Sequence, residues 1–450
     1  MPETRSTDVL LEELFAFLRI PSISSGDGTD EDLGRGAAWV AARVEDAGGA
    51  AEIVRLEGGN PLVVGRVSSG RPDAPQVVVY GHYDVQTVAP LDAWLSPPFE
   101  PEVRDGFLYA RGASDDKGNF HCVLAPLVDL ARSGELPVDV ILLSDGEEEI
   151  GGDSVVRYLR SELAGEAIDA AIVFDSDFVE RGRPALTTGV RGVATGRFTV
   201  RTGSQDAHSG IYGGAALNAA HVLADLIAGT VARDGRLPSA LEAGVTPPSA
   251  EEIESWAALP EAGGVLAEAG LSPLDGRAVA EYYERTVARP TVDVNAITCR
   301  DAAHQRTIIP CEASAQFSMR FTAGQDPDAV WDALVAHLRA LLPRGAALDV
   351  VPGHRAGGAA YDPSTPAFAL GRAAIEKATG MPCALVRSGG AIPLIPALHA
   401  LGIPALLSGA ALSDDNIHAP NERMLVSNYE LGQKMGRELL LAMGALPRPR

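Results

Sequence analysis

Apolar positions follow two different periods along the first 186 residues. Residues 8–18 and 33–47 place their apolar side chains at helical spacing, and the second stretch ends in a Gly-Gly pair. Short β-branched runs predict buried strands at residues 61–67, 76–80, 139–143 and 170–174, with a helix at residues 118–133 between two of them. This order predicts an α/β fold, with a mostly parallel sheet covered by helices on both faces.

The pattern changes near residue 187. Alternating runs predict strands at residues 192–201, 313–322 and 347–351, with helices at residues 215–229 and 327–342. This sequence of elements indicates an antiparallel sheet with helices on one face, that is, an inserted α+β domain.

The α/β order resumes after a predicted return linker at residues 352–364. The predicted elements are a helix at 366–379, a strand at 383–387, a helix at 393–401, a strand at 403–407 and a helix at 426–444. We therefore expect one domain built from residues 1–186 and 362–450, interrupted by a second domain of residues 187–361.

Composition narrows the possible partners and the compartment. The 450 residues include 60 acidic and 37 basic side chains, for a formal charge of −23, which disfavours a nucleic-acid partner. No apolar run reaches the ~18 residues that a membrane span needs, and the acidic N-terminal stretch is typical of an amphipathic helix, not a signal peptide. The four cysteines form no CxxC pair. We expect a cytoplasmic protein that binds neither nucleic acid nor membrane.

One predicted strand ends in side chains that can bind metals. The run 77–80 leads through Gly81 into His82 and Asp84. Ligand sites of α/β sheets lie beyond the carboxyl ends of the strands, where a histidine can present one ring nitrogen to a metal. A carboxylate two residues later projects to the same side and can accept the other ring N–H. A buried histidine in an ordinary hydrogen bond is the alternative.

Acidic residues occupy similar positions elsewhere. Residues 115–116 precede a predicted helix, where they either cap it or bridge two cations. Residues 145–149 carry four carboxylates after an apolar strand; this charge requires a cation unless the loop is solvated. Asp175 and Asp177 follow the next strand, and His418 lies in a polar loop before the last helix. Each of these last two segments alone is typical of an ordinary loop.

Together these segments predict a metal centre. Four strand ends and one late loop supply imidazole and carboxylate groups, enough for two three-ligand sites that share one carboxylate. Mixed nitrogen and oxygen ligands without thiolates favour Zn²⁺, with Mn²⁺ or Co²⁺ as alternatives. A remaining carboxylate beside a metal-activated water could act as a general base.

Five motifs occur in order over nearly the whole chain: GHYDVQ, RGASDDKG, GEEEIGG, VFDSD and HAPNE. In these motifs the sequence resembles the di-zinc exopeptidases of the carnosinase, aminoacylase and glutamate carboxypeptidase type, and it looks most like the cytosolic non-specific dipeptidases. The resemblance implies that residues 1–186 and 362–450 form the catalytic domain and residues 187–361 a lid or dimerisation domain.

The resemblance also implies roles for individual residues. Glu148 would be the general base, Asp84 would orient the first histidine, and the peptide bond after Asp115 would be cis. Asp177 stays an alternative to Asp175. The implied metal ligands are His82 and Asp175 on one ion, Glu149 and His418 on the other, and Asp115 bridging both.

Substrate contacts are implied in the inserted domain. The segment around His208 is similar to a family motif whose histidine polarises the scissile carbonyl in the partner subunit of a homodimer. Thr307, Arg320 and Gly390 match positions that hold the substrate. Arg320 would bind the carboxylate of the substrate. The sequence departs from the family at Ser388 and Ala391, where Glu and Ser are usual, at Cys299–Arg306, and near residues 240–248, where a Tyr-Asp-Asp stretch is missing.

The favoured function is a metal-dependent dipeptidase that uses a metal-bridged water activated by Glu148. The alternative is hydrolysis of N-acyl amino acids or carbamoyl amides at the same metal centre. An inert family member would have lost a ligand or Glu148, and neither is missing. A nucleotide-binding or redox protein is disfavoured because no GxGxxG follows a predicted strand.

Overall fold

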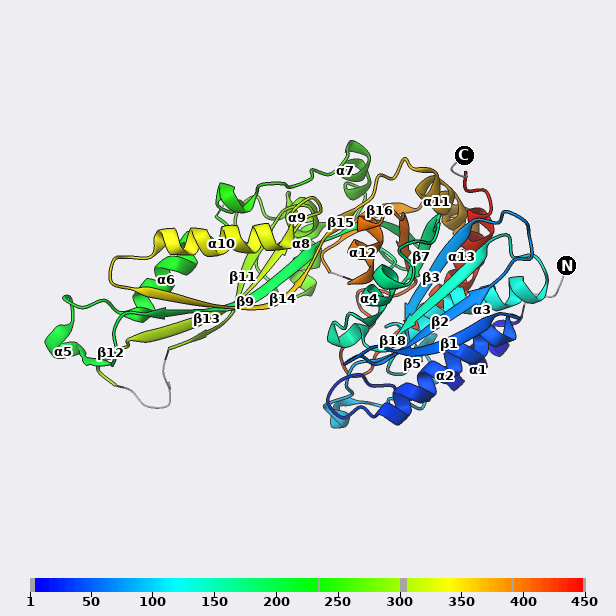
Figure 1. The fold of residues 1–450 in the computed structure, drawn as a ribbon, viewed down its shortest axis with the longest axis horizontal. Coiled ribbons are helices and arrows are strands. Elements are labelled where there is room, and N and C mark those ends of the chain that lie inside the picture. The colour runs from blue at the N-terminus through cyan, green and yellow to red at the C-terminus, as the bar shows by residue number, and fades with distance from the viewer. Residues whose placement is uncertain (1–4, 234, 300–305, 391, 448–450) are drawn as a thin grey trace. The chain divides into compact units, whose positions relative to one another are not determined.

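The computed structural model describes residues 5–233, 235–299, 306–390 and 392–447, which form two compact units (Figure 1). The first unit comprises Met1–Thr188, Tyr361–Val386 and Ile392–Arg450, and the second comprises Gly189–Ala360 and Arg387–Ala391. The division points after residues 188 and 360 lie close to the boundaries expected from the sequence.

The short segment 387–391 differs from expectation, because the sequence assigned it to the α/β domain. Its contacts explain the difference. The guanidinium of Arg387 pairs at 2.7 Å with the buried carboxylate of Glu252, and the Ser388 carbonyl accepts a hydrogen bond from the Arg191 N–H at 3.1 Å. Both partners belong to the second unit.

A nine-stranded sheet forms the centre of the α/β fold. Its strands are β1 (Ala50–Arg55), β2 (Pro61–Val67), β3 (Gln76–His82), β6 (Asp139–Asp145), β7 (Ala170–Phe174), β8 (Ala185–Val190), β15 (Ala359–Ala360), β16 (Ala384–Ser388) and β17 (Ala405–Ser408). The order is β1-β2-β6-β3-β7-β17-β8-β15, with β16 paired to β8. The neighbours β6, β3, β7 and β17 are parallel, and antiparallel pairs flank them. The predicted α/β fold is confirmed.

Helices cover both faces of this sheet, as predicted. One group contains α1 (Thr7–Leu18), α2 (Asp30–Asp46), α3 (Lys117–Arg132), α11 (Pro366–Thr379) and α13 (Val426–Met443), and the other contains α4 (Ser154–Ser161) and α12 (Leu394–Ala400). Helix α2 begins before the predicted residue 33 because the Thr29 side chain accepts the N–H of Asp32 and so caps the helix.

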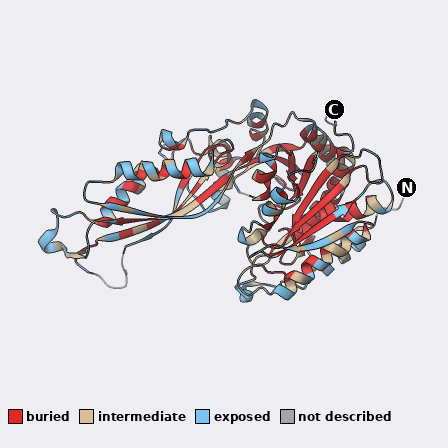
Figure 2. Ribbon diagram, in the orientation of Figure 1, coloured by how far each residue is buried: buried red, intermediate tan, exposed pale blue. Residues whose placement is uncertain are grey.

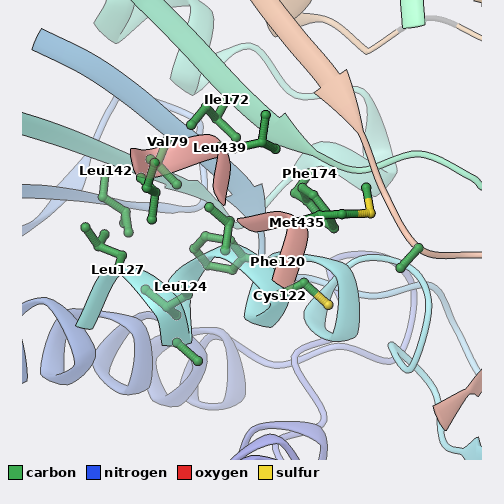
Figure 3. Packing of buried hydrophobic residues seen from close by; sticks show 14 of the residues in the cluster. Val79, Phe120, Cys122, Leu124, Leu127, Leu142, Ile172, Phe174, Met435 and Leu439 are labelled. Atoms are coloured by element: carbon green, nitrogen blue, oxygen red, sulfur yellow. The ribbon is translucent and has the colours of Figure 1, made fainter. Parts of the chain in front are cut away.

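The core lies between the parallel strands and the helices α3 and α13 (Figures 2 and 3). Gly81 permits this packing close to the end of β3, because a Cβ there would lie 2.3 Å from the ring of Phe120. The packed side chains include Val79, Leu142 and Ile172 from the sheet, Phe120 and Leu124 from α3, and Met435 and Leu439 from α13. The last residues of β3 are therefore held firmly.

The second unit contains a four-stranded antiparallel sheet in the order β11-β13-β9-β14, against which α6 and α10 pack. Its elements are β9 (Gly192–Arg201), β11 (Thr291–Thr298), β13 (Glu312–Phe321), β14 (Ala347–Ala356), α6 (Ala219–Thr230) and α10 (Pro327–Leu341).

Two sequence predictions in this unit need correction. Residues 352–356 continue β14 instead of starting a linker, because β14 is an edge strand where Pro352 is tolerated and its pairing with β9 resumes at Arg355. Helix α6 begins at Ala219 and not at 215, because the Asn218 side chain caps it by accepting the N–H of Ala220.

Shorter elements complete the two units. A three-stranded sheet has the order β18-β5-β4, and β10 pairs with β12. In the described ranges, no helix is both long and apolar enough to cross a membrane. The short elements are β4 (Glu102–Arg104), β5 (Phe107–Tyr109), β18 (Arg423–Leu425), β10 (Ala207–His208), β12 (Ile308–Ile309), α5 (Ser209–Tyr212), α7 (Ala250–Trp256), α8 (Ala262–Glu268) and α9 (Tyr282–Val287), with 3-10 turns at Leu91–Ala93, Glu148–Ile150 and Ser239–Leu241.

Candidate metal centre

Three neighbouring parallel strands bring their carboxyl ends to one edge of the central sheet. His82 is the last residue of β3, Glu148 and Glu149 follow β6, and Asp175 follows β7. The N–H of Asp175 donates to the Ser408 carbonyl of β17 at 2.9 Å, which ties this carboxylate to the fourth parallel strand. The sheet topology therefore assembles residues that lie far apart in the sequence.

Two groups of three potential ligands meet at this edge. One is His82, Asp115 and Asp175, and the other is Asp115, Glu149 and His418; within each group the ligand atoms lie within 4.8 Å of one another. Asp115 belongs to both groups. Its Oδ1 lies 3.0 Å from His82 Nε2, and its Oδ2 lies 2.9 Å from His418 Nε2. This carboxylate thus presents one oxygen to each group.

Asp84 connects the first histidine to the paired glutamates. His82 Nδ1 lies 3.0 Å from the Asp84 carbonyl and 3.3 Å from its Oδ1. The two carboxylate oxygens of Asp84 accept the N–H groups of Glu148 and Glu149, each at 3.2 Å. Contact at Nδ1 leaves His82 Nε2 directed toward Asp115. Asp84 therefore holds residues of both ligand groups in place.

Glu422 organises the loop that carries Asp115. This fully buried carboxylate accepts the N–H groups of Gly112 and Ser114 at 2.9 Å and of Asp115 at 3.0 Å. It also pairs with the buried guanidinium of Arg111 at 2.7 Å. Four donors thus fix one carboxylate, and Glu422 in turn joins the loop of Asp115 to the segment that carries His418.

Burial and mutual repulsion raise the pKa values of two acids in the centre. Burial, with the charges of Asp175 and Asp115, raises the pKa of Glu148 to about 8, and burial raises that of Asp175 to about 7. Burial also opposes ionisation of Asp115, but hydrogen bonds from His418 and His82 keep the pKa of Asp115 well below its usual range. Hydrogen bonds to Asp115 and Glu149 raise the pKa of His418 to about 10.

The carboxylates of this cluster repel one another unless protons or cations offset their negative charge. A divalent cation between the carboxylates would relieve their repulsion and displace protons from the imidazoles and acids. The donor set also fits: each group offers one imidazole and two carboxylates, without a thiolate. The residues present are therefore suited to hold two cations that share Asp115.

The structure distinguishes the two aspartates that follow β7. Asp175 contributes an oxygen to the first group, whereas Asp177 belongs to neither of the groups found among the described residues. The backbone of Asp177 forms a bridge with Ala411, and its side chain is exposed.

The Asp115–Asp116 peptide bond is cis, as the resemblance implied.

The other predicted site residues lie in the second unit. His208 on β10 is paired with Ile308 on β12, and the Ser209 N–H donates to the Thr307 carbonyl at 3.1 Å. Two segments about a hundred residues apart are thus adjacent. Arg320 lies on β13 and Gly390 in the segment after β16. Ala391, one of the noted departures, lies outside the described residues.

The sequence motifs contained two residues whose contacts were not anticipated. Gln86, the last residue of GHYDVQ, donates from Nε2 to the Glu149 carboxylate at 3.0 Å. Glu422, the last residue of HAPNE, organises the Asp115 loop as described above. Their presence in the motifs was the only signal in the sequence, and it did not specify a partner.

Comparison with known proteins shows which family and which solved structures the chain is similar to. The model of peptidase family M20/M25/M40 matches residues 78–442. Cysteinylglycine-S-conjugate dipeptidase of Corynebacterium striatum is 29% identical over 446 residues, covering 96% of this chain and 94% of the relative. Beta-Ala-His dipeptidase of Rattus norvegicus is 26% identical over 403 residues, covering 86% of this chain and 80% of the relative. The M20 family metallo-carboxypeptidase Sso-CP2 of Sulfolobus solfataricus superposes with a TM-score of 0.84 at 26% identity. The superposition covers 97% of this chain and 99% of that structure's chain.

Proposed function

The chain belongs to peptidase family M20/M25/M40, and from this premise we propose that it is a metal-dependent dipeptidase. The observation that carries the proposal is the shared carboxylate of Asp115, with one oxygen directed to each of two three-ligand groups. The dipeptidase activity named for two relatives, which align with most of this chain, supports dipeptides as the substrate class.

The proposed ligands follow the two groups. His82 and Asp175 would hold one cation, Glu149 and His418 the other, and Asp115 both. Imidazole and carboxylate donors favour Zn²⁺, with Mn²⁺ or Co²⁺ as alternatives. When bound, such a pair of cations lowers the pKa of water and polarises a carbonyl oxygen.

Glu148 is the proposed general base. Its backbone is fixed by Asp84, and among the described residues none donates a hydrogen bond to its carboxylate. That carboxylate lies close enough to Asp175 and Asp115 for their charges to raise its pKa. An unengaged carboxylate at this place can take a proton from the attacking water and deliver it to the departing amine.

His208 is proposed to polarise the scissile carbonyl. Its Nδ1 accepts the N–H of Gly210 at 3.0 Å, so the proton of the neutral ring lies on Nε2. An exposed Nε2–H is a suitable donor to a developing oxyanion. Thr307, Arg320 and Gly390 are proposed to bind the rest of the substrate, with the guanidinium of Arg320 on its carboxylate.

We propose a homodimer in which His208 reaches the partner's site. Ile211 and Tyr212, directly after His208, are 70% and 52% exposed, and neighbouring Leu217 is 38% exposed. Exposed apolar residues around a proposed catalytic side chain are typical of a surface that a partner covers. The buried thiols of Cys122 and Cys383 are compatible with the proposed cytoplasmic location.

A substrate panel tests the function. The protein is stripped with a chelator, reconstituted with Zn²⁺, Mn²⁺ or Co²⁺, and assayed on dipeptides, N-acyl amino acids and carbamoyl amino acids. We expect cleavage of dipeptides only after reconstitution. Preferential cleavage of N-acyl or carbamoyl substrates would replace the dipeptidase assignment by the amide-hydrolase alternative, and full activity after chelation would contradict metal dependence.

A further inference from the structure

Glu147 is a buried acid that has no part in the metal centre or in the proposed reaction. It directly precedes the proposed base Glu148, is 4% exposed, and belongs to neither ligand group found among the described residues. In the described chain, no basic side chain forms an ion pair with it. Removing a carboxylate from water without a counter-ion is unfavourable, so its hydrogen bonds must compensate.

The Glu147 side chain joins two separate elements. Its Oε1 accepts the N–H of Ser154, the first residue of α4, at 2.7 Å, and its Oε2 accepts the N–H of Asn60, just before β2, at 2.8 Å. The N-cap residue Asp153 makes no capping hydrogen bond with its side chain, so Glu147 caps α4 instead. Asn60 Nδ2 also donates to the Gly146 carbonyl at 2.8 Å. The segment before β2 and the start of α4 therefore both bind this part of the chain.

The backbone of Glu147 is held at the same time. Its N–H donates to Asp145 Oδ1 at 3.2 Å, and its carbonyl accepts the N–H of Gly152 at 2.9 Å. The turn that carries Glu148 and Glu149 therefore begins and closes on Glu147. Because both the backbone and the side chain of this residue are anchored, the turn cannot shift unless several hydrogen bonds at its base break.

Gly152 leaves the space that the Glu147 side chain occupies. A Cβ at Gly152 would lie 2.2 Å from Cγ, 2.3 Å from Cδ and 2.4 Å from Oε1 of Glu147. The φ of Gly152 lies outside the left-handed region, so its backbone conformation does not itself require glycine. A side chain at position 152 would therefore act by displacing the Glu147 carboxylate from Ser154.

We propose that Glu147 is a positioning residue, whose carboxylate, buried in the space left by Gly152, sets the turn that directs Glu148 and Glu149 to the metal centre. Asp84 binds the N–H groups of both glutamates and so fixes the turn from the end of β3. Glu147 anchors the same turn to the segment before β2 and to α4. The proposal rests on the proposed function, which makes Glu148 the base and Glu149 a ligand.

The test measures the two cations separately. Zn²⁺ is titrated into the metal-free protein in competition with a chromogenic chelator. Glu147→Ala should lower the affinity of one cation, the one that Glu149 is proposed to hold, by about 10- to 100-fold and leave the other unchanged. Gly152→Ala should give the same selective loss, and Glu147→Gln, which keeps one acceptor oxygen, a smaller one. At saturating Zn²⁺, kcat of Glu147→Ala should remain about 10- to 100-fold lower with KM unchanged, because Glu148 is displaced too.

A double variant shows whether the two substitutions act through the same side chain. Once the Glu147 side chain is gone, Gly152→Ala has nothing to displace, so Glu147→Ala/Gly152→Ala should lose no more affinity than Glu147→Ala alone. Additive losses, or wild-type affinities in Gly152→Ala, would overturn the proposal. A wild-type kcat at saturating Zn²⁺ would overturn the part that concerns Glu148.

The matched control is Glu252→Ala. Glu252 is also a buried glutamate, 2% exposed, but it lies in the second unit and pairs with Arg387. Its loss should lower the Tm and leave both cation affinities as in the wild type. Equal weakening of both cations by Glu147→Ala, or a selective loss in Glu252→Ala as well, would show that Glu147 merely stabilises the fold. The titration involves no hydrolysis, so a protein that binds both cations but cleaves no dipeptide would refute the proposed function alone.

Discussion

Single residues in the metal centre owe their properties to what surrounds them. Glu148 and Glu149 are adjacent and chemically identical, yet Glu149 faces His418 and Gln86 while the carboxylate of Glu148 accepts no hydrogen bond from the described residues. Both backbones are held by the same carboxylate of Asp84. This difference in partners separates a proposed ligand from a proposed base.

Replacing the proposed base tests this separation. Glu148→Gln should retain the fold and the bound cations but lower kcat by roughly 10²- to 10⁴-fold, because the amide cannot accept the proton of water. The measurements are kcat and metal content per chain. Glu162→Gln, an exposed glutamate at the end of α4, should leave both unchanged. Normal turnover by Glu148→Gln would refute its role as base.

At the scale of elements, the centre depends on loops that are joined to each other. The loop before α3 and the segment before β18 exchange hydrogen bonds through Glu422, and the hydroxyl of Ser114 donates to Asp415 at 2.7 Å. The buried Lys117 at the start of α3 donates to the carbonyls of Phe17 and Ile20, at 3.2 and 2.6 Å, and ties α1 to the same region. Both ligand loops are thereby anchored to the core.

Weakening this connection should weaken metal binding. Glu422→Gln replaces one acceptor oxygen with an NH₂ group. This removes the acceptor either of the Ser114 and Asp115 N–H groups, which share Oε1, or of the Gly112 N–H and the Arg111 guanidinium, which share Oε2. We expect an affinity for Zn²⁺ about 10- to 100-fold lower, measured by competition with a chromogenic chelator. Saturating Zn²⁺ should restore most of the activity.

The matched control for Glu422 is Glu31→Gln, an exposed acid in the first turn of α2. Its zinc affinity should equal that of the wild type. An unchanged affinity in Glu422→Gln, with the Co²⁺-substituted protein keeping its wild-type absorption spectrum, would show that Glu422 does not position the ligands.

At the scale of the whole molecule, the proposed function divides its residues between two compact units. The metal-ligand groups belong to the first unit, and His208, Thr307, Arg320 and Gly390 belong to the second. Exposed apolar side chains beside His208 support contact with a second copy of the chain. A shared site predicts that two inactive variants can repair each other.

Complementation tests the shared site. His208→Ala and Glu148→Gln should each have little activity alone. Coexpressed, they should recover about a quarter of the wild-type activity, because half of the dimers are mixed and each mixed dimer has one intact site. The measurement is the activity of the purified mixed dimer, which should be about half that of the wild type because one of its two sites is intact. A mixed dimer without activity would indicate that each protomer uses its own His208.

The sequence by itself determined the α/β order, the approximate bounds of the longer helices and of most strands of the central sheet, and the strand-end residues that meet at the centre, because apolar periodicity and turn residues are local properties. It missed β1, whose side chains are mostly exposed and follow no strict alternation, and it ended β14 too early at Pro352. In both places the partner strand decides the conformation, and the partner is not local.

Only the tertiary structure decided which of the candidate residues meet. It placed Asp175 and not Asp177 in a ligand group, attached residues 387–391 to the second unit, and gave Glu422 its donors. It also buried the Nε and Nη1 atoms of Arg191 without a hydrogen-bond partner among the described residues. Glu422 and Gly112 are 310 positions apart. The physical reason is that hydrogen bonding and desolvation depend on neighbours in space, which residue spacing along the chain does not specify.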